Sequence, residues 1–322
     1  MIEVKGQGNN VARLIKHSVS GSTGTEIFTW ELEYARFFHS EAMTHRMLSK
    51  NAASSRAIPV ERAIELIREN PAMPIHWGKN NPGMQSKAEI ADIHRSAAKG
   101  VWLSAMETII AHVKVLTEQN GIAGHKQWVN RLLEPFTVIK VVLTGTEFTN
   151  FFQLRDHADA QPEFADLVRC MKKAIEQSVP EVIHPGEWHL PYVTTKRDLG
   201  VLSYWADEET EIDVEIAKQL SASCCAQVSY RRLNNSVDKA VEIFAKLKLT
   251  RDNPEPKHYS PTEHQATPMK KLKTPILPDY WPKGVTHMDR NGEYWSGNFK
   301  DWIQYRKHIM IDSDEDFIAG GN

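Results

Sequence analysis

The sequence has few cysteines and no long apolar run, and each absence excludes a class of protein. Three cysteines among 322 residues, two of them adjacent at Cys224 and Cys225, are too few for a disulfide scaffold and fit a reducing compartment. No uninterrupted apolar run approaches the ~18 residues that a membrane helix needs, and no secretory signal pattern begins at Met1. We therefore expect a cytoplasmic protein with no membrane partner.

The sequence also lacks a strong charge of either sign. Its formal net charge is −2 at pH 7, so no overall field attracts nucleic acid, and a nucleic-acid-binding module is disfavoured. Any phosphate group must be held by a local cluster of residues. Hydrophobic residues make up 41% of the chain and charged residues 25%, which is typical of a globular protein with a sizeable core.

The most distinctive local cluster is the segment 44–56, which reads Thr-His-Arg-Met-Leu-Ser-Lys-Asn-Ala-Ala-Ser-Ser-Arg. Guanidinium groups bind phosphate through two parallel hydrogen bonds, and hydroxyl and backbone N–H groups can complete such a site. A solvated helix end capped by serines is the alternative interpretation. Composition alone does not separate the two.

Periodicity predicts the main elements of secondary structure. Alternation predicts a half-buried strand over 27–34, whereas the apolar run 138–144 fits either a buried strand or a core helix. Helical spacing is found over 34–52, 60–69, 86–118, 126–135, 162–177, 209–230 and 236–247, the last with Ser236 as N-cap. The apolar stripe of the longest helix contains Ile90, Ile93, Ala97, Val101, Ala105, Ile109 and Val113. Loops are expected over 18–25, 76–85 and 251–282, and residues 312–322 are expected to fray.

Two linked motifs resemble a known enzyme family. Thr44-His45-Arg46, seven residues and then Ser54 resembles the Arg-His-Arg-x7-Ser signature of the flavin-dependent thymidylate synthases, the ThyX family. Asn150 to Arg155, followed by Ala160-Gln161-Pro162-Glu163, resembles the family's Asn-x-x-x-Leu-Arg and Ala-Gln-x-Glu element. Two motifs in the correct order are more specific than one. The resemblance implies an α/β (α+β) fold with a central mixed or antiparallel sheet flanked by helices.

Two further segments resemble the N-terminal pieces of the family but come last in this chain. They are Ala226-Gln-Val-Ser-Tyr230 and His258-Tyr-Ser-Pro-Thr-Glu-His264. This order predicts a circular permutation similar to that of bacteriophage homologues, which is tolerated because domain termini often lie close together. We expect one permuted domain over 1–322, with the signature half in 1–180 and the flavin-binding part and tail in 200–322. A phage-encoded protein would act in the host cytoplasm.

The resemblance implies a function and a role for individual residues. The implied reaction is the reductive methylation of dUMP at C5, with FAD as cofactor and with NADPH and 5,10-methylenetetrahydrofolate as co-substrates. The enzyme would be a homotetramer with active sites at its interfaces, without a metal. FAD would contact His45, Arg46, Asn150, Ser229, Ser260 and Glu263, and the nucleotide would contact Ser54, Ser55, Arg56, Arg131 and Arg155. The reacting groups would lie near Arg155, Ser54 and His258.

Several of these residues also have simpler interpretations. Ser54 could merely end a helix, and His45 could be a hydrogen-bonded surface histidine. The histidines of the segment 258–264 could suggest a metal site, but no third ligand has convincing spacing. The pair Cys224-Cys225 is expected in the core, because nothing in the sequence around it would lower a thiol pKa. The unrelated classical thymidylate synthases need a cysteine nucleophile in a motif that this chain lacks, so no enzyme nucleophile is expected.

The chain departs from the family pattern near the nucleotide. A glutamine, an arginine, a glutamate and a tyrosine of the family are replaced by Glu41, Thr44, Ala52 and Ala57. These changes leave open a hydroxymethylase of dUMP or dCMP, or a catalytically inactive flavin- or nucleotide-binding homologue. Because the tail contains a similar Gln…Arg pattern, we hypothesise that Gln304 and Arg306 refill the nucleotide pocket.

Overall fold

A six-stranded sheet forms the centre of the computed structural model, which describes residues 1–118, 122–229, 233–247, 258–271 and 276–309. The strand order is β1-β2-β3-β5-β4, and all of these neighbours are antiparallel. A sixth strand, β6, pairs with β2 in parallel, so the sheet is mixed, in agreement with the fold that the resemblance implied. The strands are β1 (Ile2–Lys5), β2 (Val11–Ser20), β3 (Glu26–Ala35), β4 (Ser49–Ala52), β5 (Val138–Gly145) and β6 (Glu181–Ile183).

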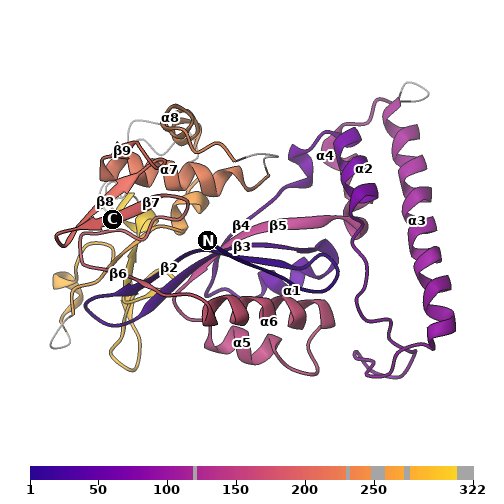
Figure 1. The fold of residues 1–322 in the computed structure, drawn as a ribbon, viewed down its shortest axis with the longest axis horizontal. Coiled ribbons are helices and arrows are strands. Elements are labelled where there is room, and N and C mark those ends of the chain that lie inside the picture. Colours follow the sequence, from indigo (N-terminus) through magenta and orange to yellow (C-terminus); the bar gives the residue numbers. More distant parts are fainter. Residues whose placement is uncertain (119–121, 230–232, 248–257, 272–275, 310–322) are drawn as a thin grey trace, which may run out of the picture.

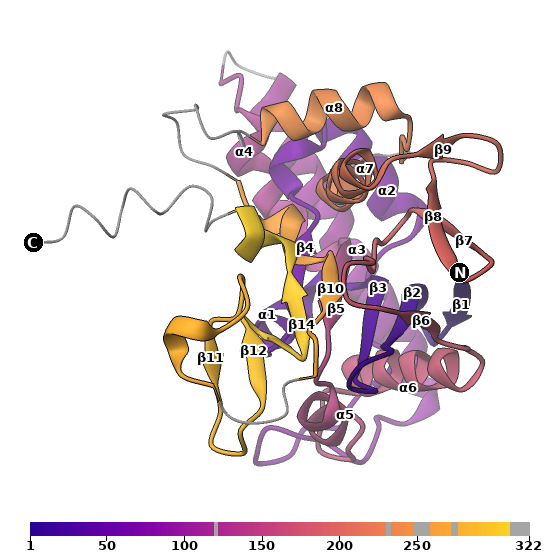
Figure 2. The ribbon, with the colours of Figure 1, turned by 90° about the vertical axis from the view of Figure 1, so that its left-hand side faces the viewer.

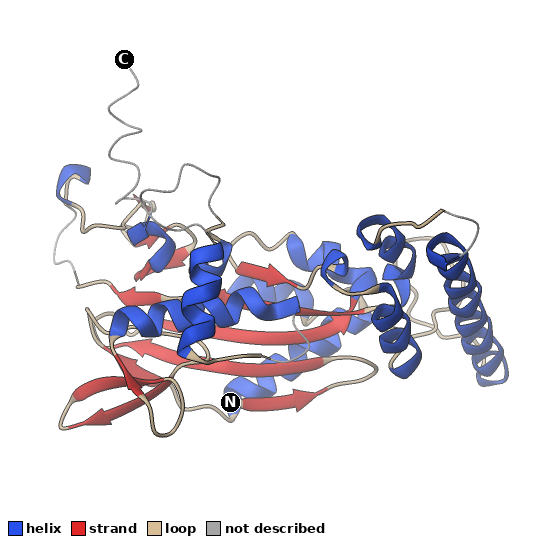
Figure 3. Cartoon of the chain, turned by 90° about the horizontal axis from the view of Figure 1, so that it is seen from above, coloured by secondary structure: helices blue, strands red, loops and turns tan. Residues whose placement is uncertain are grey.

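Helices flank this sheet on two sides (Figure 1). One pair consists of α5 (Thr149–Arg155) and α6 (Pro162–Glu176), and the opposite pair of α7 (Val214–Ala226) and α8 (Val237–Lys246). A third group lies at the end of the sheet where β5 begins, with the long α3 farthest from the strands (Figure 3). It contains α2 (Val60–Glu69), α3 (Asp92–Glu118), α4 (Lys126–Val129) and the 3-10 segment Asn130–Phe136.

Three apolar clusters hold these layers together. Trp30, Phe38 and Phe164 belong to the cluster that includes the sheet and α6. Trp188 and Trp302 belong to the cluster around α7, so packing accounts for these two tryptophans. The third cluster joins α2 and α3 to the 3-10 segment 130–136.

The C-terminal part of the chain adds short antiparallel ribbons to this frame. The β10–β14 ribbon lies beside β4 and β5 (Figure 2), where His264 and Gln304 hydrogen-bond to residues of those two strands. The further strands are β7 (Thr194–Asp198), β8 (Val201–Trp205), β9 (Glu211–Ile212), β10 (Ala266–Pro268), β11 (His287–Met288), β12 (Tyr294–Ser296), β13 (Phe299–Lys300) and β14 (Trp302–Gln304). The segment Ser260–Glu263 before β10 is a 3-10 turn.

Several predicted elements are confirmed. The strand over 27–34 is β3, and the ambiguous run 138–144 is a buried strand, β5. The helix α2 spans the predicted 60–69 and follows Pro59. The helix α8 begins where Ser236 caps it, because the Ser236 hydroxyl accepts from the backbone N–H of Lys239 at 3.3 Å.

The helix predicted over 34–52 is wrong. The strand β3 continues to Ala35, and only a 3-10 turn (Arg36–Phe38) and the five-residue α1 (His39–Met43) are helical. Residues 49–52 then form β4, whose backbone pairs with β5 in register from Ser49↔Thr144 to Ala52↔Val141. Pairing with a strand that is distant in the sequence satisfies these backbone groups and overrides the local helical spacing.

Other boundaries also differ from the prediction, among them those of one loop and of the helices α3 and α7. The loop expected over 18–25 is shorter, because β2 continues to Ser20 and pairs with both β3 and β6. The helix α3 begins at Asp92 rather than residue 86. The helix α7 begins after Asp213, whose carboxylate accepts from the N–H groups of Glu215 and Ile216, rather than at residue 209.

Some predictions fall outside the described residues, namely those on Tyr230, on 251–257, on 272–275 and on 312–322. Within the part of the chain that is described, no helix has the length and apolar character needed to cross a membrane.

Candidate functional site

The short strand β4 is where the two halves of the chain meet. At its start, the side-chain amide of Gln304 donates to the Ser49 hydroxyl at 3.2 Å. Just beyond its end, the backbone N–H of Ser54 donates to the Ser229 hydroxyl at 2.9 Å. The segment 44–56 is therefore a turn, a strand and a second turn, in contact with Ser229 of the late segment 226–230 and with Gln304 of the tail.

The first group of candidate residues surrounds Arg155, the last residue of α5. Its Nε donates to Nε2 of His45 at 2.8 Å, and one terminal nitrogen donates to the Glu41 carboxylate at 2.8 Å. The other terminal nitrogen is 3.5 Å from the Thr44 hydroxyl. The guanidinium lies over the ring of Phe164, 4.8 Å from its centroid. Two segments, residues 41–45 and the helix α6, thus fix its orientation.

The electrostatics of His45 agree with this geometry. Burial, together with the charges of Arg155 and Lys50, lowers the pKa of His45 to about 4. A neutral ring has one nitrogen free to accept a hydrogen bond, and Nε2 accepts the one from Arg155. Burial also lowers the pKa of Lys50 to about 8, and its ammonium donates to the backbone carbonyls of His45 and Leu48.

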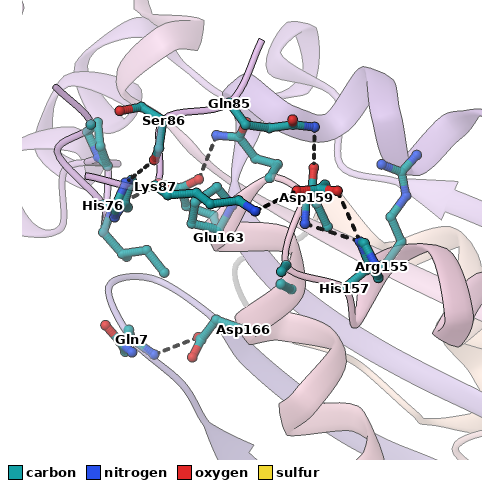
Figure 4. Close-up of a pocket in the computed structure, with 18 of the residues that line it drawn as sticks. Gln7, His76, Gln85, Ser86, Lys87, Arg155, His157, Asp159, Glu163 and Asp166 are labelled. Carbon is teal, nitrogen blue, oxygen red and sulfur yellow. Dashed lines mark hydrogen bonds and ion pairs between the residues drawn. The ribbon is translucent and has the colours of Figure 1, made fainter. Parts of the chain in front are cut away.

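A cavity of about 1050 Å³ opens beside Arg155 and Glu41. It lies between the loop 74–89 and the turn that joins α5 to α6, and Figure 4 shows Gln85 and Lys87 reaching across toward Asp159. The Gln85 amide donates to the Asp159 carbonyl at 2.7 Å, and the Lys87 ammonium is 3.7 Å from the Asp159 carboxylate. The cavity therefore lies between the second sequence motif and the loop 74–89.

A second group gathers on Glu134 in the 3-10 segment 130–136. One carboxylate oxygen of Glu134 accepts from the Ser55 hydroxyl and from Arg131, both at 2.8 Å. A terminal nitrogen of Arg36 lies 3.2 Å from the same oxygen. Arg56 is exposed in the turn that contains Ser55.

A third group lies around Glu263. Arg306 forms an ion pair with the Glu263 carboxylate, and the Gln304 amide donates to the Glu263 carbonyl at 3.2 Å. His258 and Ser260 are exposed nearby in the chain. His264 is fully buried, which lowers its pKa to about 3, and its Nδ1 is 2.8 Å from the Thr144 hydroxyl.

The comparisons with known proteins bear on residues 3–181, which match the family model described as "Thymidylate synthase complementing protein". This match spans more than half of the chain and contains both linked motifs. The chain belongs to this family. The resemblance to the flavin-dependent thymidylate synthases is thereby confirmed.

Solved structures similar to this family member include two of "a UMP/dUMP methylase PolB from Streptomyces cacaoi". The one bound with 5-Br UMP is 15% identical, with a TM-score of 0.43, and covers 54% of this chain and 92% of that chain. The one bound with 5-Br dUMP is 14% identical, with a TM-score of 0.41, and covers 54% and 93%. A search of curated proteins finds no match.

Not all candidate residues of this ThyX-family chain come together. Arg46 and Asn150 are exposed, and neither side chain hydrogen-bonds to another described residue. Among the described residues, no hydrogen bond joins the Glu134 group to Arg155, and none joins Arg306 to Thr44. The assigned roles in binding and catalysis, including the refilling hypothesis, stay predictions.

Sequence reasoning missed two members of these groups. Glu134 was detectable only as a carboxylate three residues after Arg131, a spacing that lets side chains meet on a helical turn. Arg36 gave no signal, since it lies far from Glu134 in the sequence. The expected burial of the cysteines is confirmed, and burial raises the pKa of the Cys224 thiol to about 12.

Proposed function

We propose that this protein is an FAD-dependent thymidylate synthase. It methylates dUMP at C5, taking the carbon from 5,10-methylenetetrahydrofolate and reducing equivalents from NADPH. The observation that carries the proposal is the meeting of the two linked family motifs at one place, where Arg155 donates to His45 at 2.8 Å beside a cavity of about 1050 Å³. Arg155 supplies a planar, positively charged group that can bind an anionic ligand beside this cavity, which is also lined by the carboxylates of Glu41 and Glu163.

The nucleotide is bound by Ser54, Ser55, Arg56, Arg131 and Arg155, with Gln304 and Arg306 closing the pocket. In a single chain, Arg155 shares no hydrogen bond with the Glu134 group among the described residues. A second copy that brings the two groups to one nucleotide accounts for this separation. The proposed assembly is therefore a homotetramer with interfacial active sites.

The flavin is held by His45, Arg46, Asn150, Ser229, Ser260 and Glu263. The polar groups near Glu263 suit a polar cofactor, because Nε of Arg306 and Nε2 of His264 are buried without a hydrogen-bond partner in the described structure. When bound, the flavin supplies the hydride. The contacts of Ser54 with Ser229 and of Ser49 with Gln304 support one permuted domain over 1–322.

The chain's own residues orient the substrate and stabilise charge. Arg155 is held by His45 and Glu41, and its positive charge stabilises the negative charge that develops on the base. Ser54 and His258 border the reacting groups. Burial of Cys224 and Cys225 raises the pKa of each thiol, which supports a reaction without a cysteine nucleophile.

The visible spectrum of the purified protein tests the cofactor. Flavin bands, either as isolated or after adding FAD, are expected, and a protein that takes up no flavin would contradict the proposal. Mass spectrometry of dUMP and dCMP incubated with folate and NADPH then tests the reaction. A methyl product from dUMP is expected. A hydroxymethyl product, or a product from dCMP, would instead indicate a related pyrimidine-modifying activity. No product from a flavin-loaded protein would indicate a binding role without catalysis.

A further inference from the structure

Three groups converge on one carboxylate oxygen of Glu134. The Ser55 hydroxyl and Arg131 each donate to it at 2.8 Å, and a terminal nitrogen of Arg36 is 3.2 Å away. The other terminal nitrogen of Arg36 donates to the Ala53 carbonyl at 3.3 Å. Donors that come from three separate segments are thus aimed at one point at the end of β4.

The charges at this point are not balanced. Arg36 and Arg131 carry two positive charges at this oxygen, and Glu134 carries one negative charge, which leaves one positive charge. Arg56 lies in the neighbouring turn that contains Ser55. A phosphate monoester is an anion at neutral pH, so this positive excess attracts it. Each guanidinium has five N–H donors, of which the described hydrogen bonds of Arg36 and Arg131 use only a few.

The exposure of the two arginine side chains to solvent differs. The Arg131 side chain is 52% exposed, whereas that of Arg36 is 16% exposed and therefore held in place. Burial lowers the pKa of Arg36, Glu134 raises it and Arg131 lowers it, so Glu134 offsets only part of the cost of burying this charge. An added anion at this point would offset more of it.

We infer that Arg36 is a phosphate-binding residue that acts with Arg131 and Ser55 on the phosphate of the nucleotide. The inference rests on the proposed function and extends it to a residue outside both sequence motifs. Glu134 holds the donors together in the absence of ligand. Arg36 also brings one more guanidinium to a chain whose signature has Thr44 in place of an arginine.

Isothermal titration of the full-length protein with three probes tests this inference: dUMP, 2′-deoxyuridine and inorganic phosphate. In the Arg36→Met variant, dUMP and phosphate should bind at least about tenfold more weakly, since a charged hydrogen bond is lost. Binding of deoxyuridine, which has no phosphate, should stay within about twofold. The matched control is Arg62→Met, which removes an arginine paired with Glu65 on α2 and should change no affinity.

The Arg36→Lys variant keeps the proposal testable if the methionine variant does not fold. It retains the charge but loses the planar fork, so dUMP should bind several-fold more weakly at an unchanged melting temperature. An unchanged dUMP affinity in a folded Arg36 variant, or equal losses for dUMP and deoxyuridine, would overturn the inference. A wild-type protein that binds neither dUMP nor phosphate would overturn it as well. Binding of phosphate alone, lost in the Arg36 variants, would keep the phosphate site and reject the proposed function.

Discussion

Three arginines of the candidate site are each paired with a carboxylate in the described structure. Arg155 pairs with Glu41 at 2.8 Å, Arg131 pairs with Glu134 at 2.8 Å, and Arg306 pairs with Glu263. An anionic ligand therefore enters groups that are already partly neutralised, and it must share or displace these partners. Removing one member of a buried ion pair leaves the charge of the other member uncompensated, which is costly. The carboxylates therefore matter as much as the arginines.

Substitution of Arg306 tests the refilling hypothesis at this scale. Arg306→Ala should raise the KM for the nucleotide at least tenfold, since one charged donor is worth roughly 1.5–3 kcal/mol, while the protein still folds. Steady-state kinetics give the KM, circular dichroism reports folding, and the visible spectrum reports bound flavin. An unchanged KM would refute the hypothesis. Loss of flavin together with an unchanged KM would instead assign Arg306, the partner of Glu263, to the cofactor.

At the scale of elements, the long helix α3 packs differently along its length. Met106, Ile110 and Val113 are buried against α2 and the 3-10 segment 130–136, whereas Ile93 is 80% exposed and Val101 is 71% exposed. The stripe predicted from the sequence contains Ile93 and Val101, so its N-terminal half is wrong as a core face. The first turns of α3 extend beyond α2, as Figure 1 shows.

A matched pair of substitutions within α3 measures this difference. Ile110→Ala should lower the free energy of unfolding by about 2–5 kcal/mol, because Ile110 is 1% exposed and its loss leaves a cavity. Ile93→Ala in the same helix should change it by less than about 0.5 kcal/mol. Urea denaturation of both variants provides the measurement. Equal effects would contradict the packing of α3 described above.

At the scale of the whole molecule, a buried chain of hydrogen bonds crosses the sheet. The Ser18 hydroxyl and Nδ1 of His189 are 2.8 Å apart, and Nε2 of His189 is 2.9 Å from the Thr29 hydroxyl. The chain continues from Thr29 to Thr144 and from Thr144 to Nδ1 of His264, each at 2.8 Å. It links β2, β3 and β5 to two segments of the C-terminal half.

The two histidines of this hydrogen-bond network make the stability of the protein depend on pH. Burial lowers the pKa of His264 to about 3, and burial, with the charges of Lys16, His17 and His264, lowers that of His189 well below its ordinary value of 6.5. Between the folded and unfolded pKa values the unfolded state binds more protons. Stability should thus be full above about pH 6.5 and fall as the pH decreases, by about 1.4 kcal/mol per pH unit for each histidine.

Urea denaturation between pH 4.5 and 7.5 measures this dependence. His264→Asn should reduce the slope by about one proton, whereas His94→Asn, at an exposed position of α3, should leave it unchanged. A slope in the His264 variant equal to that of the wild type would show that His264 does not contribute.

The sequence by itself determined the family. It also determined those helices and strands whose buried face follows from the spacing of neighbouring residues. The strand β3, the helices α2 and α8 and the two linked motifs were all predictable, since side-chain periodicity and caps are properties of neighbouring residues.

Only the tertiary structure decided what the segment 44–56 becomes and which side chains surround it. Its strand β4 exists because β5 lies beside it, and the partners Glu134, Ser229 and Gln304 come from distant parts of the chain. Such contacts depend on backbone pairing and packing summed over the whole fold. The local sequence does not include these long-range contacts. Its spacing therefore predicts a helix, whereas pairing with β5 makes residues 49–52 a strand.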